Sequence, residues 1–385
     1  MYDFIIIGSG IGGSTVFKEL NNKHPDKKIL LLEKGDEPKY VAEGNDVQVL
    51  YLNSLGGSAL YSVGNAIRID LKYIGIKEDI YDEIEKELNV NPVPMDFINE
   101  TTKKLFDYGF KQTPKYINFN KCNSCGMCAS RLCHAKWTPR DFLKQYKNSM
   151  ILHNFEVLNI KKENELFFVE GFNSKNNKKM IFKGKTVIVS AGGVNSPRIL
   201  SSILDNEHLG KNLFVDTFIT VGGFLEGANL NKSVPMSVYR KYNGFLLSPH
   251  YSILLYDEIK KENKDIKNND VFGLMIKIKD ENNGVVGKDY VYKNITEKDE
   301  ELLSKGFKEA LNILSDIGVN NMYKTIPRGS HPSGTCAVGK VVNKDFETEI
   351  DGLFVCDASV FPESLGLPPI LGIIAIGKKL ANCLQ

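Results

Sequence analysis

Four cysteines lie close together in the first half of the chain, and thiols spaced in this way could hold a metal centre. Cys122, Cys125, Cys128 and Cys133 have the spacing C-x2-C-x2-C-x4-C. This run is one residue longer at its end than the C-x2-C-x2-C-x3-C run of bacterial ferredoxins. The pattern favours an iron–sulfur cluster, and [4Fe–4S] in particular because four thiols are available. Two alternatives stay open: a structural zinc site, since four thiolates also suit tetrahedral Zn²⁺, and four free thiols.

A glycine-rich turn near the start of the chain could bind the phosphates of a dinucleotide. It follows the β-branched and aromatic run 2–7, which suits a strand buried on both faces. Gly8 would permit the tight turn, Gly10 would let the backbone approach a pyrophosphate, and Gly13 would let the next helix pack on the strand. The segment 14–20 reads as that helix, whose N-terminal N–H groups would face the phosphates.

A second buried strand, 28–32, ends at Glu33, whose carboxylate would accept hydrogen bonds from a ribose hydroxyl. Strand, glycine turn, helix, strand and acid therefore occur in the order that dinucleotide binding requires. The alternative is a glycine-rich turn in an unrelated α/β fold. No regular alternation of strands and helices follows, which argues against a simple nicotinamide dehydrogenase.

The C-terminal part of the chain holds two further groups that could do chemistry. His331 opens the segment His-Pro-Ser-Gly-Thr, and Asp357 ends the strand 352–357. An acid at the carboxyl end of a strand is typical of a cofactor contact. An imidazole titrates near neutral pH and can take the proton that an alcohol must lose when it gives up a hydride. We therefore predict that His331 is a catalytic base or a hydrogen-bonding group at the cofactor, with a buried structural histidine as the alternative.

The composition is that of an ordinary globular protein and excludes some classes of partner. The 385 residues include 42% hydrophobic and 25% charged residues, and the net charge is +2. Such a weak net charge predicts neither nucleic-acid binding nor attachment to a membrane surface. No targeting segment and no apolar stretch long enough to span a bilayer is visible, so we expect a cytoplasmic location. Cytosolic thiols stay reduced, which favours metal or redox chemistry over disulfides for the cysteines.

Several short motifs along the chain together resemble one family. They are the opening glycine turn, Gly56-Gly57-Ser58 with Asn65, Ala191-Gly192-Gly193 with Ser196-Pro197, Gly210-Lys211-Asn212-Leu213, and the span from His331 to Ala375. With these elements the chain resembles the glucose–methanol–choline (GMC) family of FAD oxidoreductases at both ends and in the middle. Its C-terminal motifs are most similar to those of cholesterol oxidases and long-chain alcohol oxidases.

The resemblance implies an α/β fold, with a Rossmann-like FAD-binding domain and a smaller antiparallel-sheet substrate domain. It implies FAD as cofactor and places His331 beside flavin N5, where it would take the proton of a substrate hydroxyl. Some family members also resemble the chain in carrying a cysteine-rich insertion at this point, which holds an iron–sulfur cluster near FAD. The residues expected to contact FAD are Gly8, Gly10, Ile11, Gly13, Glu33, Lys34, Gly56, Gly57, Ser58, Asn65, Ala191, Gly192, Asp357, Ala358, Pro368 and Pro369.

One position departs from the family pattern. The family has Asn or His just before a proline at the start of the last helix, where this chain has Pro368 before Pro369. A proline side chain neither donates nor accepts a hydrogen bond. Either another side chain takes that role at the substrate oxygen, or the reaction differs from the family's.

The motifs also predict how the chain is divided. We expect a discontinuous FAD-binding domain of residues 1–72, 118–222 and 327–385, a helical connection of residues 73–117, and a substrate domain of residues 223–326. Residues 157–182 read as an antiparallel hairpin or meander. In the substrate domain we expect strands at 245–247, 252–256 and 271–276, a hairpin turn at Asn283-Gly284, and a helix from Thr296 to about residue 317.

These features together predict an FAD-dependent dehydrogenase that oxidises a CH–OH group of an alcohol, polyol or sugar. A flavin can pass electrons to oxygen directly, so a cluster beside it indicates a protein acceptor, such as a ferredoxin or a partner subunit. One alternative is a flavin and iron–sulfur electron-transfer subunit without an alcohol substrate of its own. Another is an FAD-dependent reductase of an apolar isoprenoid.

Overall fold

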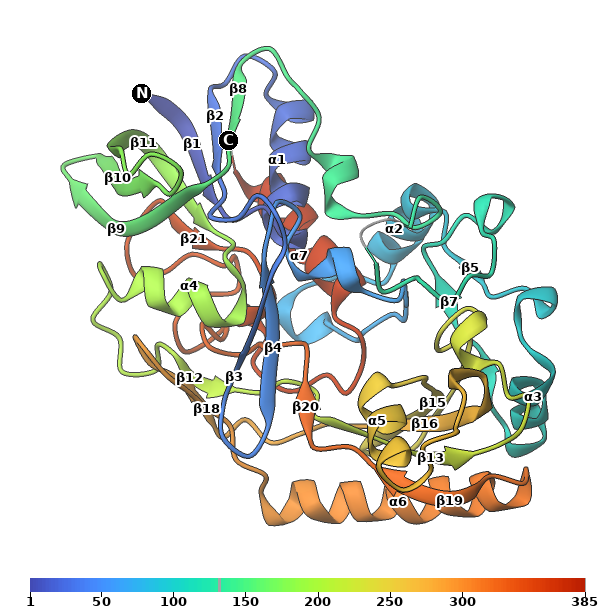
Figure 1. Ribbon diagram of the computed structural model, residues 1–385. Coiled ribbons are helices and arrows are strands. Elements are labelled where there is room, and N and C mark those ends of the chain that lie inside the picture. Colours follow the sequence, from blue (N-terminus) through green and yellow to red (C-terminus); the bar gives the residue numbers. More distant parts are fainter. Residues whose placement is uncertain (131–132, 385) are drawn as a thin grey trace.

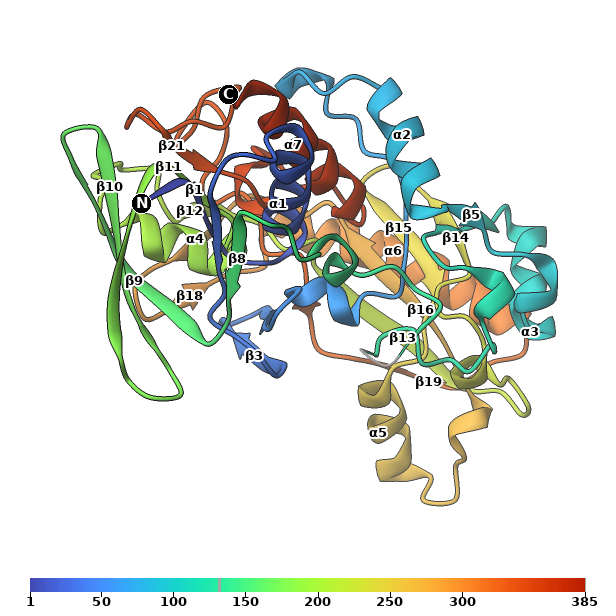
Figure 2. The ribbon, with the colours of Figure 1, turned by 90° about the horizontal axis from the view of Figure 1, so that it is seen from above.

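The computed structural model describes residues 1–130 and 133–384, and two large sheets carry its fold (Figure 1). The first sheet lies near both ends of the chain. The second lies on the other side of the molecule, with a long helix along its outer face. Figure 2, turned by 90°, shows the same separation.

The first sheet has seven strands, in the order β8-β2-β1-β11-β10-β9, with β21 beside β11. Its β1, β2, β8, β11 and β21 pair in parallel, whereas β9, β10 and β11 pair in antiparallel fashion. The central strands are continuous apolar runs because helices or loops cover both faces. The bounds are β1 (Tyr2–Ile7), β2 (Ile29–Leu32), β8 (Ser149–Leu152), β9 (Phe155–Glu163), β10 (Leu166–Asn173), β11 (Lys179–Val189) and β21 (Leu353–Val355).

The second sheet has nine strands, in the order β3-β4-β20-β13-β16-β15-β14-β6, with β19 beside β13. All its pairings are antiparallel except that of β4 with β20. The bounds are β3 (Lys39–Glu43), β4 (Gln48–Asn53), β6 (Lys111–Gln112), β13 (Phe218–Phe224), β14 (Val238–Lys241), β15 (Phe245–Pro249), β16 (Val271–Ile278), β19 (Asn320–Lys324) and β20 (Arg328–Gly329).

Two small sheets complete the strands. They contain β12 (Lys211–Leu213), β17 (Gly284–Val286) and β18 (Val291–Tyr292), and separately β5 (Asn91–Pro92) and β7 (Pro114–Lys115). The expected domain boundary at residue 222 falls inside β13. In addition, β3, β4 and β20 come from the segments expected to bind FAD but join the second sheet, so the two parts share strands.

Helices cover the two sheets. They are α1 (Ile11–Lys23), α2 (Asp79–Leu88), α3 (Glu100–Lys103), α4 (Gly192–Leu200), α5 (Ile253–Glu262), α6 (Glu297–Asp316) and α7 (Ile370–Cys383). In both ribbon views α1 and α7 lie side by side, and α7 is almost entirely buried. No helix within the described ranges is long and apolar enough to cross a membrane.

Most of the local predictions hold, and two are wrong. The hairpin within 157–182 is β9, β10 and β11, and the helix predicted from Thr296 is α6, which begins with a capping box between Thr296 and Asp299. The strand predicted at 252–256 is instead the start of α5, because the hydroxyl of Ser252 caps the N–H of Leu255. The turn predicted at Asn283-Gly284 is not formed, since Gly284 already belongs to β17.

Candidate functional site

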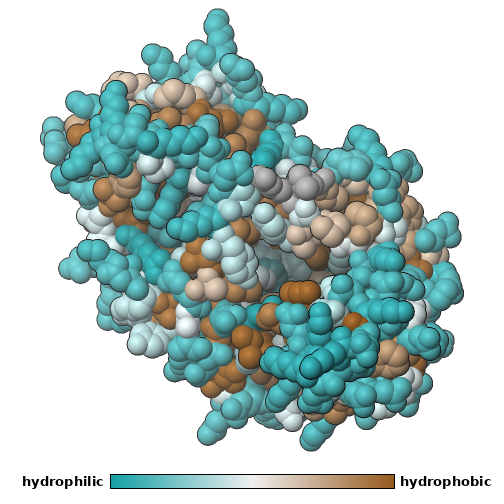
Figure 3. All heavy atoms as spheres, viewed as in Figure 1, coloured by the Kyte–Doolittle hydropathy of each residue, from teal (hydrophilic) through white to brown (hydrophobic). Residues whose placement is uncertain are grey.

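A cavity of about 750 Å³ lies against the glycine turn and extends to His331. Figure 3 shows that this face of the molecule is hollowed near its middle, between the parts that hold the two sheets. Besides His331, the predicted site residues that line the cavity are Gly8, Gly10, Ile11, Glu33, Lys34, Gly57, Ser58, Ala191, Gly192, Asp357, Ala358 and Pro369. Gly13, Gly56, Asn65 and Pro368 lie outside this lining.

The glycine turn leaves room for a ligand where the sequence predicts one. Gly8 has a φ of 101°, and a Cβ there would lie 2.3 Å from the carbonyl oxygen of Ser190. A Cβ on Gly10 would meet no atom within 4 Å, so its backbone faces open space. No side chain caps the first turn of α1, and no acid occurs in it. The free N–H groups of that turn therefore point to the cavity as an anion-binding end.

Glu33 connects the end of β2 to the glycine turn. Its carboxylate accepts hydrogen bonds from the backbone N–H of Ser9 (2.9 Å), the hydroxyl of Ser9 (2.6 Å) and the N–H of Gly35 (2.7 Å). Burial raises the pKa of this carboxyl, and the hydrogen bonds oppose that effect. Glu33 thus fixes the shape of the turn as well as lining the cavity.

Asp357 plays a similar part at the other side of the cavity. Its Oδ2 accepts hydrogen bonds from the N–H of Gly192 (2.8 Å) and from the hydroxyl of Ser196 (2.5 Å), and its Oδ1 accepts one from the N–H of Ser359 (2.8 Å). These bonds hold the first turn of α4 against the carboxyl end of β21. A Cβ on Gly192 would meet nothing within 4 Å, so this backbone also borders open space.

His331 is held by a carboxylate and approached by an ammonium group. Its Nδ1 lies 2.9 Å from Oδ2 of Asp216 and 3.3 Å from Nζ of Lys277. Burial and the charge of Lys277 lower the pKa of His331, while Asp216 acts in the opposite direction. The neutral ring therefore donates its Nδ1–H to Asp216 and carries its lone pair on Nε2. That nitrogen has no hydrogen-bond partner among residues 1–130 and 133–384.

Asp216 was not found from the sequence. It is buried, has a φ of 51°, and its Oδ1 accepts hydrogen bonds from the N–H of Gly366 (2.9 Å) and the hydroxyl of Ser364 (3.0 Å). These contacts fix the carboxylate that orients His331. The available signal was an acid directly after the apolar run 213–215, since a buried acid needs partners.

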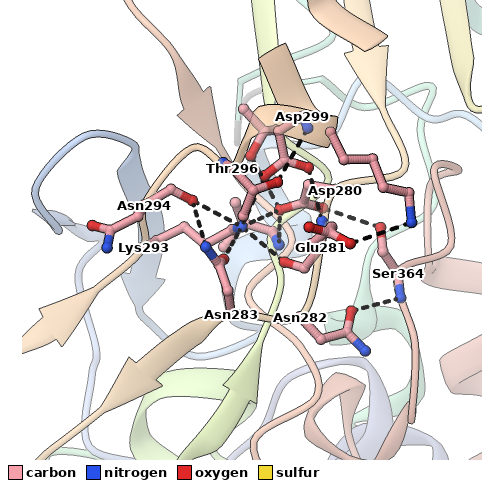
Figure 4. A network of polar contacts seen from close by, with 12 residues as sticks. Asp280, Glu281, Asn282, Asn283, Lys293, Asn294, Thr296, Asp299 and Ser364 are labelled. Carbon is pink, nitrogen blue, oxygen red and sulfur yellow. Dashed lines mark hydrogen bonds and ion pairs between the residues drawn. The ribbon is translucent and has the colours of Figure 1, made fainter. Parts of the chain in front are cut away.

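Asp216 is connected through Ser364 to a network of buried charges around Asp280 and Lys293, which Figure 4 shows. The hydroxyl of Ser364 also lies 3.0 Å from Oδ1 of Asp280, whose Oδ2 is 3.2 Å from Nζ of Lys293. Lys293 is in turn 3.7 Å from Oδ2 of Asp299, near the start of α6. The network thus anchors the region of Asp216 to the first turn of α6.

Lys277 is the second residue that sequence reasoning missed. It lies on β16 within the apolar run 271–278 and is buried, and burial lowers its pKa while Asp216 and Asp280 act to raise it. A lysine inside such a run is the signal that could have identified it, because buried cations rarely occur without a partner or a function.

Pro368 lines a small void together with apolar residues, among them Ile67, Met236 and Leu246, and with polar ones. This void of about 10 Å³ separates it from Asn65, Thr113, Ser248 and Lys277. The hydroxyl oxygen of Thr113 is buried and has no hydrogen-bond partner in the described part of the chain. Polar groups are therefore present beside Pro368, though not at its own position.

The four cysteines are neighbours, but the structure does not gather them into a metal site. No group of three or more His, Cys, Asp or Glu side chains is arranged to hold a metal ion among the residues that the structure describes, which leave out 131–132 inside this run. Cys128 is buried and Cys125 is exposed. Burial raises the pKa of Cys128 to about 11, and the thiols of Cys133 and Cys122 add to this despite the opposing charge of Lys115.

Two buried lysines lie beside the cysteine run. Lys115 donates to the carbonyl of Val63 (2.8 Å) and to Oδ1 of Asn65 (2.5 Å). Lys136 donates to three carbonyls, those of Leu60 (2.9 Å), Ser62 (2.7 Å) and Cys128 (2.7 Å). Burial lowers the pKa of Lys115 to about 7 and that of Lys136 to about 8.

Comparison with known proteins identifies the family. Models of the GMC oxidoreductase N- and C-terminal domains match residues 76–218 and 285–377. The uncharacterized protein MJ1450 of Methanocaldococcus jannaschii is 48% identical over 382 residues, which are 99% of each chain. The long-chain-alcohol oxidase FAO1 of Arabidopsis thaliana is 23% identical over 274 residues, which are 53% of this chain and 36% of FAO1. The chain thus matches only about a third of the length of the plant enzyme.

Solved structures agree on the fold. Pyridoxine 4-oxidase from Mesorbium loti superposes with a TM-score of 0.78 at 14% identity, covering 100% of this chain and 99% of that one. Formate oxidase from Aspergillus oryzae gives a TM-score of 0.76 at 14% identity, covering 100% and 98%. The predicted fold class, an FAD-binding α/β part with a sheet-containing substrate part, is confirmed. The chain therefore belongs to the GMC oxidoreductase family of FAD enzymes.

Proposed function

We propose that the chain is a dehydrogenase that oxidises a CH–OH group, with FAD in the large cavity, and that it passes electrons through a cysteine-ligated iron–sulfur cluster to a protein acceptor. The observation that carries the first part is His331, held by Asp216 with its Nε2 free at the edge of a 750 Å³ cavity. We further propose that the part of the chain around the first sheet binds FAD, and that residues 223–326 together with the second sheet bind the substrate.

The residues of the cavity fit FAD. The open space at Gly10 and Gly192 would admit the cofactor, and the uncapped first turn of α1 suits its pyrophosphate. The carboxylate of Glu33, which is hydrogen-bonded to Ser9 and Gly35, would also accept a hydrogen bond from a ribose hydroxyl. When bound, FAD supplies the acceptor for the hydride that leaves the substrate carbon.

His331 would hold the proton in this reaction. Its Nε2 takes the hydroxyl proton of the substrate, the C–O bond becomes a carbonyl, and the imidazole becomes cationic. The carboxylate of Asp216, 2.9 Å from Nδ1, stabilises that cation and keeps the ring in one orientation. The lowered pKa keeps the imidazole neutral, and therefore basic, at neutral pH.

The buried lysines support the cluster. Lys115 and Lys136 form no ion pair with a carboxylate in the ranges that the structure describes, and both interact electrostatically with Cys128. A buried cation is costly unless an opposite charge compensates it. A cluster held by four thiolates is anionic and would supply that charge beside both lysines. Neutral thiols would not.

The exposure of the cysteine run suits a protein acceptor. Cys125 and Met127 are exposed, whereas Cys128 faces inward. Lys115 interacts electrostatically with Cys128 and donates a hydrogen bond to Asn65. Asn65 shares a void with Lys277, whose Nζ lies 3.3 Å from Nδ1 of His331. A cluster here would lie between the reaction site and the surface, where a ferredoxin or a partner subunit could receive electrons.

Anaerobic preparation of the protein tests both parts of the proposal. We expect flavin absorption bands together with about four irons per chain, and bleaching of the flavin by at least one member of a panel of alcohols, polyols and sugars. Replacement of His331→Ala should abolish bleaching but leave the flavin bound. Zinc or no metal in place of iron would refute the cluster, and a flavin that no alcohol reduces would refute the dehydrogenase.

Pro368 favours a second candidate, an electron-transfer subunit without its own alcohol substrate. The polar group that the family has at this position is absent. In that case reduced ferredoxin, and none of the alcohols, would reduce the flavin in the same experiment.

A further inference from the structure

Arg328 has two buried guanidinium nitrogens for which the described residues supply no hydrogen-bond acceptor. Its Nε and Nη2 are buried and form no hydrogen bond within the described residues, and the side chain takes part in no ion pair there. The group lies over the ring of Phe218, with 5.1 Å between Cζ and the ring centroid. A cation–π contact leaves the N–H donors unsatisfied, and buried donors nearly always have a hydrogen-bond partner.

The position of Arg328 connects it to the reaction site. It opens β20, three residues before His331. Its charge acts on the phenol of Tyr40, and both Tyr40 and Ser330 line the large cavity. Arg328 itself does not line the cavity, but Ser330, His331 and Tyr40 do, so the guanidinium adjoins residues of its lining.

The strand register places Arg328 and Lys277 on one face of the second sheet. Phe218 of β13 is the partner of both Arg328 and Lys277, and directly paired residues point to the same face. The next residue along β16, Ile276, points to the opposite face, where Gly306 of α6 packs against it. The face with the two cations is thus the one that α6 leaves uncovered.

The charge on this face is not balanced. The carboxylate of Asp216 is already engaged by His331, Ser364 and Gly366, and Asp280 is paired with Lys293. His250, whose ring packs near Phe218, has its pKa lowered to about 4 by burial and by Arg328 and Lys277, so it adds no charge at neutral pH. Asp216 and Asp280 both act on Lys277, but each already has other partners, and no carboxylate pairs with Arg328 among the described residues.

We propose that the substrate carries an oxyanion, a carboxylate or a phosphate, in addition to the hydroxyl group, and that Arg328 binds this anion. The planar guanidinium forms paired hydrogen bonds with either group. The substrate would then span from Arg328 to Nε2 of His331. This inference rests on the proposed function and names the substrate class of that site. Uncharged alcohols and apolar isoprenoids would leave the guanidinium unsatisfied.

Binding of simple anions tests the site without turnover. The FAD-loaded, oxidised protein is titrated with acetate, lactate and inorganic phosphate, and with lactamide as the neutral analogue, while the flavin spectrum and the thermal midpoint are recorded. We expect an anion of one class to perturb both, and lactamide to have no effect. Carboxylate and phosphate probes in separate titrations distinguish the two sources of the oxyanion.

Substitutions test whether anion binding depends on Arg328 rather than on another cation of the second sheet. Arg328→Gln should weaken anion binding about 10- to 100-fold, as expected for loss of charge-assisted hydrogen bonds, and Arg328→Lys should restore part of it. Arg240→Gln is the control, because Arg240 lies on the same sheet but pairs with Glu309 at 3.4 Å. Flavin content and circular dichroism show whether each variant folds.

The outcomes distinguish this inference from the proposed function. If Arg328→Gln binds every anion as tightly as the unchanged protein, or if neutral alcohols reduce the flavin as efficiently as their anionic analogues, the anion site is refuted while the dehydrogenase stands. If anions bind through Arg328 but no alcohol of either class reduces the flavin, the dehydrogenase fails and the anion site stands.

Discussion

At the scale of single residues, the proposed chemistry depends on two side chains that lie near the same nitrogen of His331. Asp216 and Lys277 both approach Nδ1 of His331, at 2.9 and 3.3 Å, and they move its pKa in opposite directions. The carboxylate orients the ring and stabilises its charged form. The ammonium group favours the neutral form, which is the form that can act as a base.

Asp216→Asn should reduce the rate of flavin reduction by about 10²- to 10⁴-fold, as expected when a base loses the group that orients it. The amide keeps the shape and the bonds to Ser364 and Gly366 in part, so FAD binding should persist. Anaerobic stopped-flow spectroscopy measures the effect. A variant as fast as the unchanged enzyme would show that Asp216 is structural.

The pH dependence of flavin reduction should separate the two charges. If His331 is the base that we propose, the rate should rise as pH passes upward through its pKa, because only the neutral ring can take a proton. Lys277→Met removes a charge that lowers this pKa, so the acidic limb should move to higher pH. Asp216→Asn removes a charge that raises it, so the residual activity should show a limb at lower pH. Shifts in the same direction in both variants would contradict this arrangement.

At the scale of elements, the sequence predicts those strands and helices that are determined by the pattern of neighbouring residues. The apolar runs of β1 and β2 and the capping box of α6 are visible in the order of residues, and they lie where they were expected. Asp216 and Lys277 were missed because each is one charged residue beside or within an apolar run. Their common partner His331 follows β20, and Gly366, which binds Asp216, lies in the loop before α7, so only the folded sheets bring these residues together.

The glycine turn offers an element-scale test of cofactor binding. Gly10 has ordinary backbone angles and open space at its Cβ position, so Gly10→Ala should fold normally but place a methyl group in the phosphate site. Gly12→Ala should fail to fold well, because its Cβ would lie 1.7 Å from the carbonyl of Cys356. Circular dichroism and flavin content distinguish the two. Unchanged flavin affinity in Gly10→Ala would argue against phosphate binding at this turn.

The buried ion pairs of Lys293 with Asp280 and Asp299 should contribute more to the free energy of unfolding than exposed ion pairs nearby. Lys293→Met leaves Asp280 and Asp299 without their cation, and breaking a buried pair costs about 3–5 kcal/mol. Lys298→Met, which removes an exposed pair with Glu281, should cost about 0–1 kcal/mol. Urea unfolding of the two variants measures the difference. Equal losses would mean that Lys293 does not carry the network.

At the scale of the whole molecule, buried positively charged side chains occur both near the proposed reaction site and near the cysteine run. The large cavity lies against the first sheet, and the second sheet carries Lys277 and Arg328 on one face. Lys115 donates to Asn65 and interacts electrostatically with Cys128. The resemblance to a family predicted FAD as the cofactor, which the family membership supports, whereas His331 as the base stays a prediction. Lys115 and Arg328 could not be predicted as buried cations, since neither lies in an apolar run as Lys277 does, and the sequence alone does not show which cations lack an acid partner.

If the cysteines hold an iron–sulfur cluster, Lys115 should affect its reduction potential, whereas four free thiols would show no such effect. If this buried cation compensates an anionic cluster, Lys115→Met should disfavour the addition of an electron and make the cluster's reduction potential more negative. A redox titration followed by electron paramagnetic resonance measures this without turnover. Lys121→Met is the control, because the exposed charge beside Cys122 is screened by solvent and should shift the potential less. Equal shifts would refute the compensating role, and a protein without iron would refute the cluster itself.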